Sequence, residues 1–187
     1  GVRRLIFNFF VLSLGYDEAL LGTMITVHNL TALLAALPMG YLADRLGRKL
    51  SLVSSTILVA LSVVIMVSFP KAWVLVALNI VFGLGMSISS VTMGPFLMEN
   101  SSETERTYLF SFGSGLTMAA GFIGNWIGGY LPGWMGTTFQ VDAISSTAYG
   151  AALIATAVLA VIGVLPLLLL RSEERRVGKG CRSRWSP

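Results

Sequence analysis

The sequence predicts an all-α protein, a polytopic bundle of membrane helices, and three observations carry this prediction. Hydrophobic residues make up 55% of the 187 residues and charged residues only 12%, with a mean hydropathy of +0.77. Apolar runs recur along the chain, and five of them reach the length of about 20 residues that a bilayer core requires. Basic residues fall mostly in the connections that would lie on one side of the membrane, as the positive-inside rule predicts. This balance is typical of an integral membrane protein organised as one domain.

Five full spans are predicted, in chain order, over 18–41, 50–69, 72–98, 108–131 and 148–170. Pro70-Lys71 ends the second span and Pro132-Gly133 ends the fourth. Residues 5–14 are also apolar, but ten residues of helix rise only about 15 Å, half of a bilayer. This stretch is either an interfacial anchor or the rear part of a truncated span.

The tail at 171–187 breaks sharply with the rest of the chain. It holds six Lys/Arg and two Glu, whereas the other 170 residues hold seven basic and seven acidic residues, so the net charge of +4 resides in the tail. The tail resembles the conceptual translation of a sequencing-library adapter. The competing interpretation is a basic juxtamembrane segment that binds anionic lipid. We expect 1–170 to form the transmembrane bundle and 171–187, with Cys181, to be a non-native disordered tail. The gene would then continue past Leu170.

A charged segment, Gly40-Tyr-Leu-Ala-Asp-Arg-Leu-Gly-Arg-Lys49, separates the first two full spans and predicts a tight turn. Its glycines permit close backbone approach or positive φ, and Asp44 can cap a helix start or pair with a cation. The segment resembles the major facilitator superfamily signature G-x-L-A-D-R-x-G-R-K, although a basic turn is common in any polytopic protein. All eight specified positions match: Gly40, Leu42, Ala43, Asp44, Arg45, Gly47, Arg48 and Lys49.

The resemblance implies the N-terminal six-helix half of a transporter, with a partial first helix followed by helices 2 to 6. It further implies secondary active transport of a small molecule by alternating access, driven either by a coupling ion or by the solute gradient itself, with a missing C-terminal six-helix half and the signature as a conformational switch. The expected location is the lipid bilayer of the cell membrane, as a multi-pass protein of the bacterial inner membrane type. Cations place the signature on the cytoplasmic side, opposite Lys71. A membrane-embedded enzyme or a non-transporting receptor of similar topology is the alternative.

Polar residues inside the apolar spans are candidates for lining a cavity. His28 is the single histidine, and it either binds protons or forms a hydrogen bond between helices. A stripe of small and polar residues runs through 79–94 at helical spacing, and it either lines a water-filled cavity, as in the resembled family, or packs against another helix. Arg3 and Arg4 are either membrane anchors or charges within the membrane. The candidate cavity-lining residues are Asn8, His28, Asn29, Asn79, Ser87 and Ser90.

Glycines mark two expected packing faces. Two family patterns are incomplete here: Asn79 stands where R-x-x-q-G-x-g has its basic residue, and Asn125 stands at the proline of G-P-x-I-G-G. The first departure puts proton coupling at this site in doubt, and the second leaves only a weak indication of export. The predicted helix-packing residues are Gly83, Gly85, Gly121, Gly124, Gly128 and Gly129.

The sequence carries no arrangement typical of an enzyme. It has no second histidine, no cysteine outside the tail, and no H-E-x-x-H, G-x-S-x-G or phosphate-binding G-x-x-x-x-G-K-[ST] pattern. We therefore expect no catalytic or metal-binding residues, no cofactor and no nucleic-acid partner. The spans at 50–69 and 148–170 lack charges, Asn, Gln and His, and we expect them to be lipid-facing supports.

Overall fold

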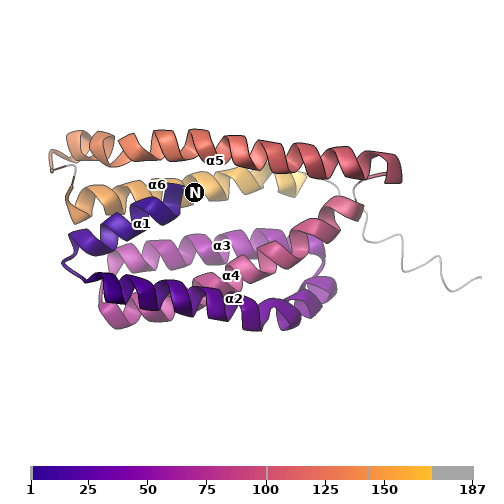
Figure 1. The fold of residues 1–187 in the computed structure, drawn as a ribbon, viewed down its shortest axis with the longest axis horizontal. Helices are drawn as coiled ribbons and strands as arrows, with labels where there is room; N and C mark the ends of the chain where they lie inside the picture. The colour runs from indigo at the N-terminus through magenta and orange to yellow at the C-terminus, as the bar shows by residue number, and fades with distance from the viewer. Residues whose placement is uncertain (1, 100, 143, 170–187) are drawn as a thin grey trace, which may run out of the picture.

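The structure, a computed structural model, describes residues 2–99, 101–142 and 144–169. Within these residues the chain is almost entirely helical, with short connections, and has no strand, which confirms the all-α prediction (Figure 1). Six helices follow one another in chain order: α1 (Val2–Ser13), α2 (Glu18–Leu46), α3 (Arg48–Ser68), α4 (Ala72–Glu99), α5 (Glu103–Phe139) and α6 (Ser146–Leu169). The predicted tail lies outside the described residues.

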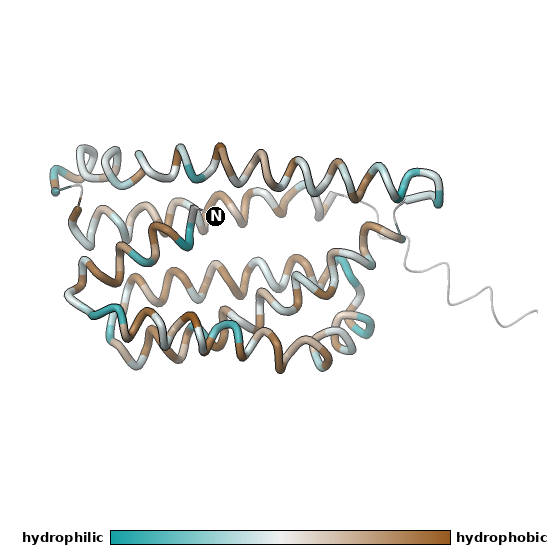
Figure 2. The backbone as a smooth tube through the Cα atoms, in the orientation of Figure 1, coloured by the Kyte–Doolittle hydropathy of each residue, from teal (hydrophilic) through white to brown (hydrophobic). Residues whose placement is uncertain are grey.

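Consecutive helices run in opposite directions between two ends of the bundle, here called the Gly47 end and the Pro70 end. At the Pro70 end, the Tyr16 hydroxyl donates a 2.9 Å hydrogen bond to the Pro70 carbonyl oxygen and so ties two connections together. At the Gly47 end, the Lys49 ammonium donates to the Leu168 carbonyl oxygen at 2.8 Å. Hydrophilic residues concentrate near these ends, with further stretches inside α1 and α2 (Figure 2). This is the arrangement expected of helices that cross a bilayer.

Four of the described helices, α2, α3, α4 and α6, are long and apolar enough to cross a membrane by length and composition. The sequence predicted five spans, and α5 is the one that falls outside this group. At 37 residues α5 is amply long, but its many glycines, serines and threonines lower its hydropathy. Residue 132 does not end it as predicted, because Pro132 lies inside the helix, which ends at Phe139 with Gln140 in the left-handed region at φ 54°. A proline removes only one backbone hydrogen bond, and a packed membrane helix tolerates that loss.

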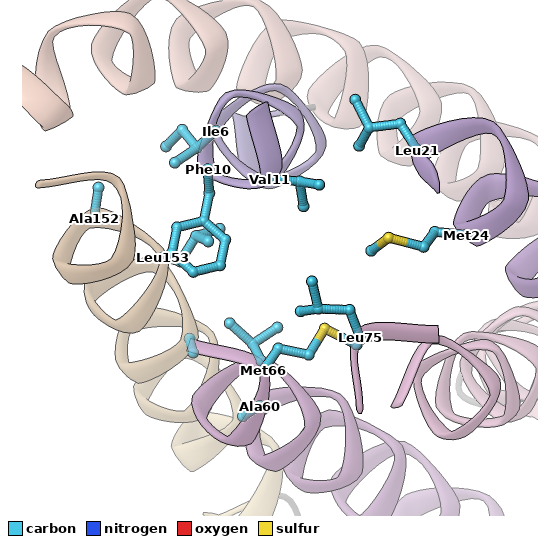
Figure 3. Close-up of a cluster of buried hydrophobic side chains, with 12 residues drawn as sticks. Ile6, Phe10, Val11, Leu21, Met24, Ala60, Met66, Leu75, Ala152 and Leu153 are labelled. Atoms are coloured by element: carbon cyan, nitrogen blue, oxygen red, sulfur yellow. The ribbon is translucent and has the colours of Figure 1, made fainter. Parts of the chain in front are cut away.

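A hydrophobic cluster near the Pro70 end holds five helices together (Figure 3). Phe10 and Val11 of α1, Met24 of α2, Met66 of α3 and Leu75 of α4 are each at most 2% exposed. The other members of the cluster are Ile6, Leu21, Ala60, Val63 and, in α6, Ala152, Leu153 and Ala157. In a bilayer the alternative to burial between helices is contact with lipid, so van der Waals packing and not exclusion from water is what this cluster contributes.

The third helix is more central than the expected lipid-facing support. It packs most extensively against α4 and α6 and buries Ser51, Ser55 and Ser62, each 1% exposed. Their hydroxyls donate to carbonyl oxygens of the preceding turn, including Gly47 and Leu52. Because each hydroxyl bonds to a nearby carbonyl oxygen earlier in the chain, α3 can bury these serines without partners from other helices.

The signature segment is not a loop, contrary to the prediction of a turn over the whole of 40–49. Residues 40–46 form the last turns of α2, and α3 begins at Arg48, so Gly47 alone lies between the helices. Its φ of 89° and ψ of 141° are accessible chiefly to glycine. Asp44 does not cap α3, because the N-cap of that helix is Gly47 and makes no side-chain cap bond.

Candidate functional site

A cavity of about 260 Å³ lies between α1, α2, α3 and α4. Its wall near the Pro70 end includes side chains of the hydrophobic cluster, among them Leu21, Met24 and Met66. The structure brings together four of the six residues predicted to line a cavity, Asn8, His28, Asn29 and Asn79. They arrive from three different helices, so a polar pocket is assembled between helices that are otherwise apolar.

The cavity lies near the middle of the helices that would cross the bilayer. His28 is ten residues from the start of α2, Phe82 is ten residues from the start of α4, and Arg3 is ten residues from the end of α1. All three of these helix termini are at the Pro70 end, and ten residues of helix rise about 15 Å. A hydrocarbon core about 30 Å thick that begins near these termini would place the polar lining near mid-depth.

Arg3 and Arg4 both line this cavity, which favours charges within the membrane over surface anchors. The Arg3 guanidinium carbon lies 3.9 Å from the centre of the Phe82 ring, in cation–π geometry. The same ring lies 5.1 Å from the His28 ring at an interplanar angle of 55°. Phe82 thus positions both a cation and an imidazole at the wall of the cavity.

Two polar side chains of the lining differ in how they are held. The Asn79 amide nitrogen donates to the Leu75 carbonyl oxygen, one turn earlier, at 2.8 Å. Nδ1 of His28 is buried and has no hydrogen-bond partner among the described residues. An unpartnered buried nitrogen is costly, so His28 would gain from a ligand or a water that bonds to Nδ1.

Ser87 and Ser90 are not in the lining, contrary to prediction. The Ser87 hydroxyl donates to the Ala32 carbonyl oxygen at 3.1 Å and joins α4 to α2. The Ser90 hydroxyl is exposed and donates to Met86 of its own helix. A serine in a membrane helix bonds readily to nearby carbonyls, so its position in an apolar run does not show that it faces a cavity.

Gly83 of the stripe and its neighbour Gly85 pack against other helices, as the other interpretation expected, whereas a Cβ added at Gly94 would meet nothing within 4 Å in the part of the chain that the structure describes. A Cβ at Gly83 would lie 2.8 Å from the His28 carbonyl oxygen, and one at Gly85 would lie 2.7 Å from a Val59 methyl group. Gly121 and Gly129 of α5 have nothing within 4 Å among the described residues, so this structure gives them no packing partner. Of the remaining predicted packing glycines, Gly128 is buried and Gly124 is half-buried.

Arg48 is the centre of the charged groups at the Gly47 end. It lies 3.1 Å from Glu99 at the end of α4 and 3.8 Å from Asp44 in α2. Arg45 instead stacks over Tyr41, 4.6 Å from the ring centre. The pair with Glu99 was not predicted, because the sequence showed Glu99 only as part of an acidic stretch between helices.

Fold and site together define a polytopic helical membrane protein with a polar cavity at mid-depth. The chain belongs to the Major Facilitator Superfamily, whose family model matches residues 4–185. The matched range runs into the tail, so it does not support the exclusion of 171–187, which stays a prediction. Neither a curated protein nor a solved structure matches the chain. Family membership makes this a transporter-type chain and disfavours the enzyme and receptor alternatives.

Proposed function

We propose that the chain is the N-terminal half of a secondary active transporter that moves a small solute by alternating access. The observation that carries this proposal is the cavity, which gathers Arg3, His28 and Asn79 at mid-depth between apolar helices. Polar and ionisable groups are expensive in hydrocarbon and are typical of solute and ion pathways. A second six-helix bundle would cover the open side of the cavity, and a gradient of an ion or a solute would drive the transport cycle.

The signature segment would act as the conformational switch on the cytoplasmic side. Gly40 has nothing within 4 Å, which leaves room for a helix of the second bundle to pass close by. Asp44 is 70% exposed as a side chain and 3.8 Å from Arg48, a geometry worth only about 0–1 kcal/mol within this bundle. Asp44 is therefore free to exchange partners between states, whereas Arg48 stays on Glu99.

Alternating access is tested in proteoliposomes that carry both bundles. In a cysteine-free background, Asn79→Cys is exposed to a membrane-impermeant thiol reagent from one side or the other. We expect labelling from both sides, with each side favoured under opposite solute gradients. Labelling from one side only, whatever the gradient, would contradict the proposal.

The switch is tested by Asp44→Asn, with Glu99→Gln as the comparison. Asp44→Asn should slow solute exchange and raise labelling of Asn79→Cys from the cytoplasmic side, with little effect on the free energy of unfolding. Glu99→Gln should affect the contact between α3 and α4 and change stability first. If Asp44→Asn lowers stability and leaves labelling unchanged, the segment is a scaffold and not a switch.

A further inference from the structure

The charged residues in the wall of the cavity are all cationic. Arg3 and Arg4 contribute two permanent positive charges, and His28 adds an imidazole. The other polar lining residues are neutral amides, and the lining includes no Asp or Glu. A cavity of this composition attracts negative charge and repels cations at close range.

Arg3 has no internal partner that matches its charge. Neither ion pair between described residues involves Arg3, and the close contact made by the Arg3 guanidinium is the face of Phe82. A guanidinium has five N–H donors in a planar fork, and an aromatic face engages its charge without accepting those hydrogen bonds in full. An unpaired cation at mid-depth is costly, and a bound anion would offset that cost.

The rest of the lining is apolar and limits the size of the ligand. Phe7, Ile25 and Met86 lie in the wall with side chains of the hydrophobic cluster. The volume of about 260 Å³ is at or below the lower end of the 300–1,000 Å³ typical of sites for drug-sized molecules. The site therefore suits a small molecule with an apolar body and one charged group.

We propose that this cavity binds a small organic anion, a carboxylate with an aromatic or aliphatic body, with the carboxylate on Arg3 and Arg4. The fork of a guanidinium matches a carboxylate in bidentate geometry. The Phe82 ring packs against the Arg3 guanidinium, and the apolar body of the ligand would rest against Phe7 and Met86. This inference rests on the transport function proposed above and names the class of its solute.

The test uses three probes of one shape, 2-naphthoate, 2-naphthamide and 2-naphthamidine, which are anionic, neutral and cationic. Binding to the chain in nanodiscs of zwitterionic lipid is measured by calorimetry, with empty nanodiscs subtracted. We expect naphthoate to bind at least tenfold more tightly than naphthamide, and naphthamidine to bind least. This comparison needs no variant. Equal affinities, tighter binding of the cation, or no binding of naphthoate would overturn the inference.

Variants then locate the carboxylate. Arg3→Gln should weaken naphthoate binding by about 10- to 100-fold, the value of one charged hydrogen-bonding group, and leave naphthamide unchanged. Arg3→Lys should restore part of the loss, because it keeps the charge without the fork. Lys71→Gln, which removes a cation outside the lining at the Pro70 end, is the matched control and should change nothing. An equal loss in Lys71→Gln would indicate general electrostatic attraction and overturn the assignment to Arg3.

Transport and labelling measurements distinguish a failure of the anion site from a failure of the transport function on which it rests. If the transporter with both bundles moves a neutral or cationic solute and not an anion, the anion site is wrong and the transport function stands. If the labelling test of Asn79→Cys shows no alternating access while naphthoate still binds through Arg3, the anion site stands and the transport proposal fails.

Discussion

Gly83 of α4 lies close against α2, and replacing this glycine should push the two helices apart. A Cβ at position 83 would lie 2.8 Å from the His28 carbonyl oxygen and 3.1 Å from the Thr31 Cβ. The first contact is with backbone, which cannot rotate away. The strain must therefore be relieved by moving one helix from the other, at a cost of about 1–3 kcal/mol for an overpacked interior.

The matched control is Gly22→Ala in α2, where an added Cβ meets nothing within 4 Å. Both variants gain the helix propensity of alanine, about 1 kcal/mol, so their difference isolates the contact. Gly94 is a poorer control, because it precedes Pro95 and a side chain before proline disfavours the helical region. We expect Gly83→Ala to have a free energy of unfolding about 1–3 kcal/mol below that of Gly22→Ala. The measurement is reversible unfolding in micelles titrated with SDS, followed by circular dichroism.

A double-mutant cycle with Ser87→Ala tests whether the helices separate. Ser87 joins the same two helices through Ala32 at 3.1 Å, and its loss should cost about 0.5–1.5 kcal/mol in the unchanged protein. In the Gly83→Ala background the same change should cost little, because the bond is already broken. Additive effects of the two changes, or equal stabilities of Gly83→Ala and Gly22→Ala, would refute the close contact.

Three further predictions concern the helix ends. Tyr16→Phe removes the 2.9 Å hydrogen bond to Pro70 and should lower the free energy of unfolding by about 0.5–1.5 kcal/mol; Tyr108→Phe, at a tyrosine 78% exposed, should change it little, and equal losses would contradict this. Hydrogen bonds from Ser102 lower the pKa of Glu105, so Ser102→Ala should raise that pKa, measured by NMR titration. The Glu105 carboxylate stabilises the fold fully above its ordinary pKa, and this stabilisation is lost as pH falls through the lowered pKa of the folded state. The difference in free energy of unfolding between wild type and Ser102→Ala should therefore shrink over that pH range, and a constant difference would contradict the prediction. Cysteines at Leu46 and Thr138 in a cysteine-free background should be labelled from opposite sides, Leu46 from the cytoplasm, and reversed labelling would refute the orientation.

Long apolar runs predicted the helices well, because a bilayer sets the length that each must reach. The amides and the histidine in those runs could also be singled out as cavity candidates, because such groups are rare in hydrocarbon. Asn8, His28 and Asn29 do line one cavity. Serines gave no such guidance because their hydroxyls bond to carbonyl oxygens nearby. The helical state of the signature segment was missed because charge and glycine usually indicate a turn.

Contacts between distant helices could not be predicted from one sequence. The pair of Arg48 with Glu99 and the stacking of Arg3 on Phe82 each join residues on different helices. Periodicity places a residue on a face of its own helix, but the neighbour of that face depends on how the helices are arranged. The same reason explains why Gly83 packs against α2 while Gly121 faces open space.

The single residue between α2 and α3 has a consequence for biosynthesis. Although Gly47 joins them directly, α2 packs far more extensively on α4 than on α3. The partners of one such contact, Ala32 and Ser87, are 55 residues apart in the chain. At about 5–20 residues per second, the ribosome needs about 3–11 s to supply that distance. During this interval the face of α2 that will pack against Gly83 can contact only lipid or the insertion machinery. The contact between α2 and α4 therefore forms only after α4 has left the ribosome.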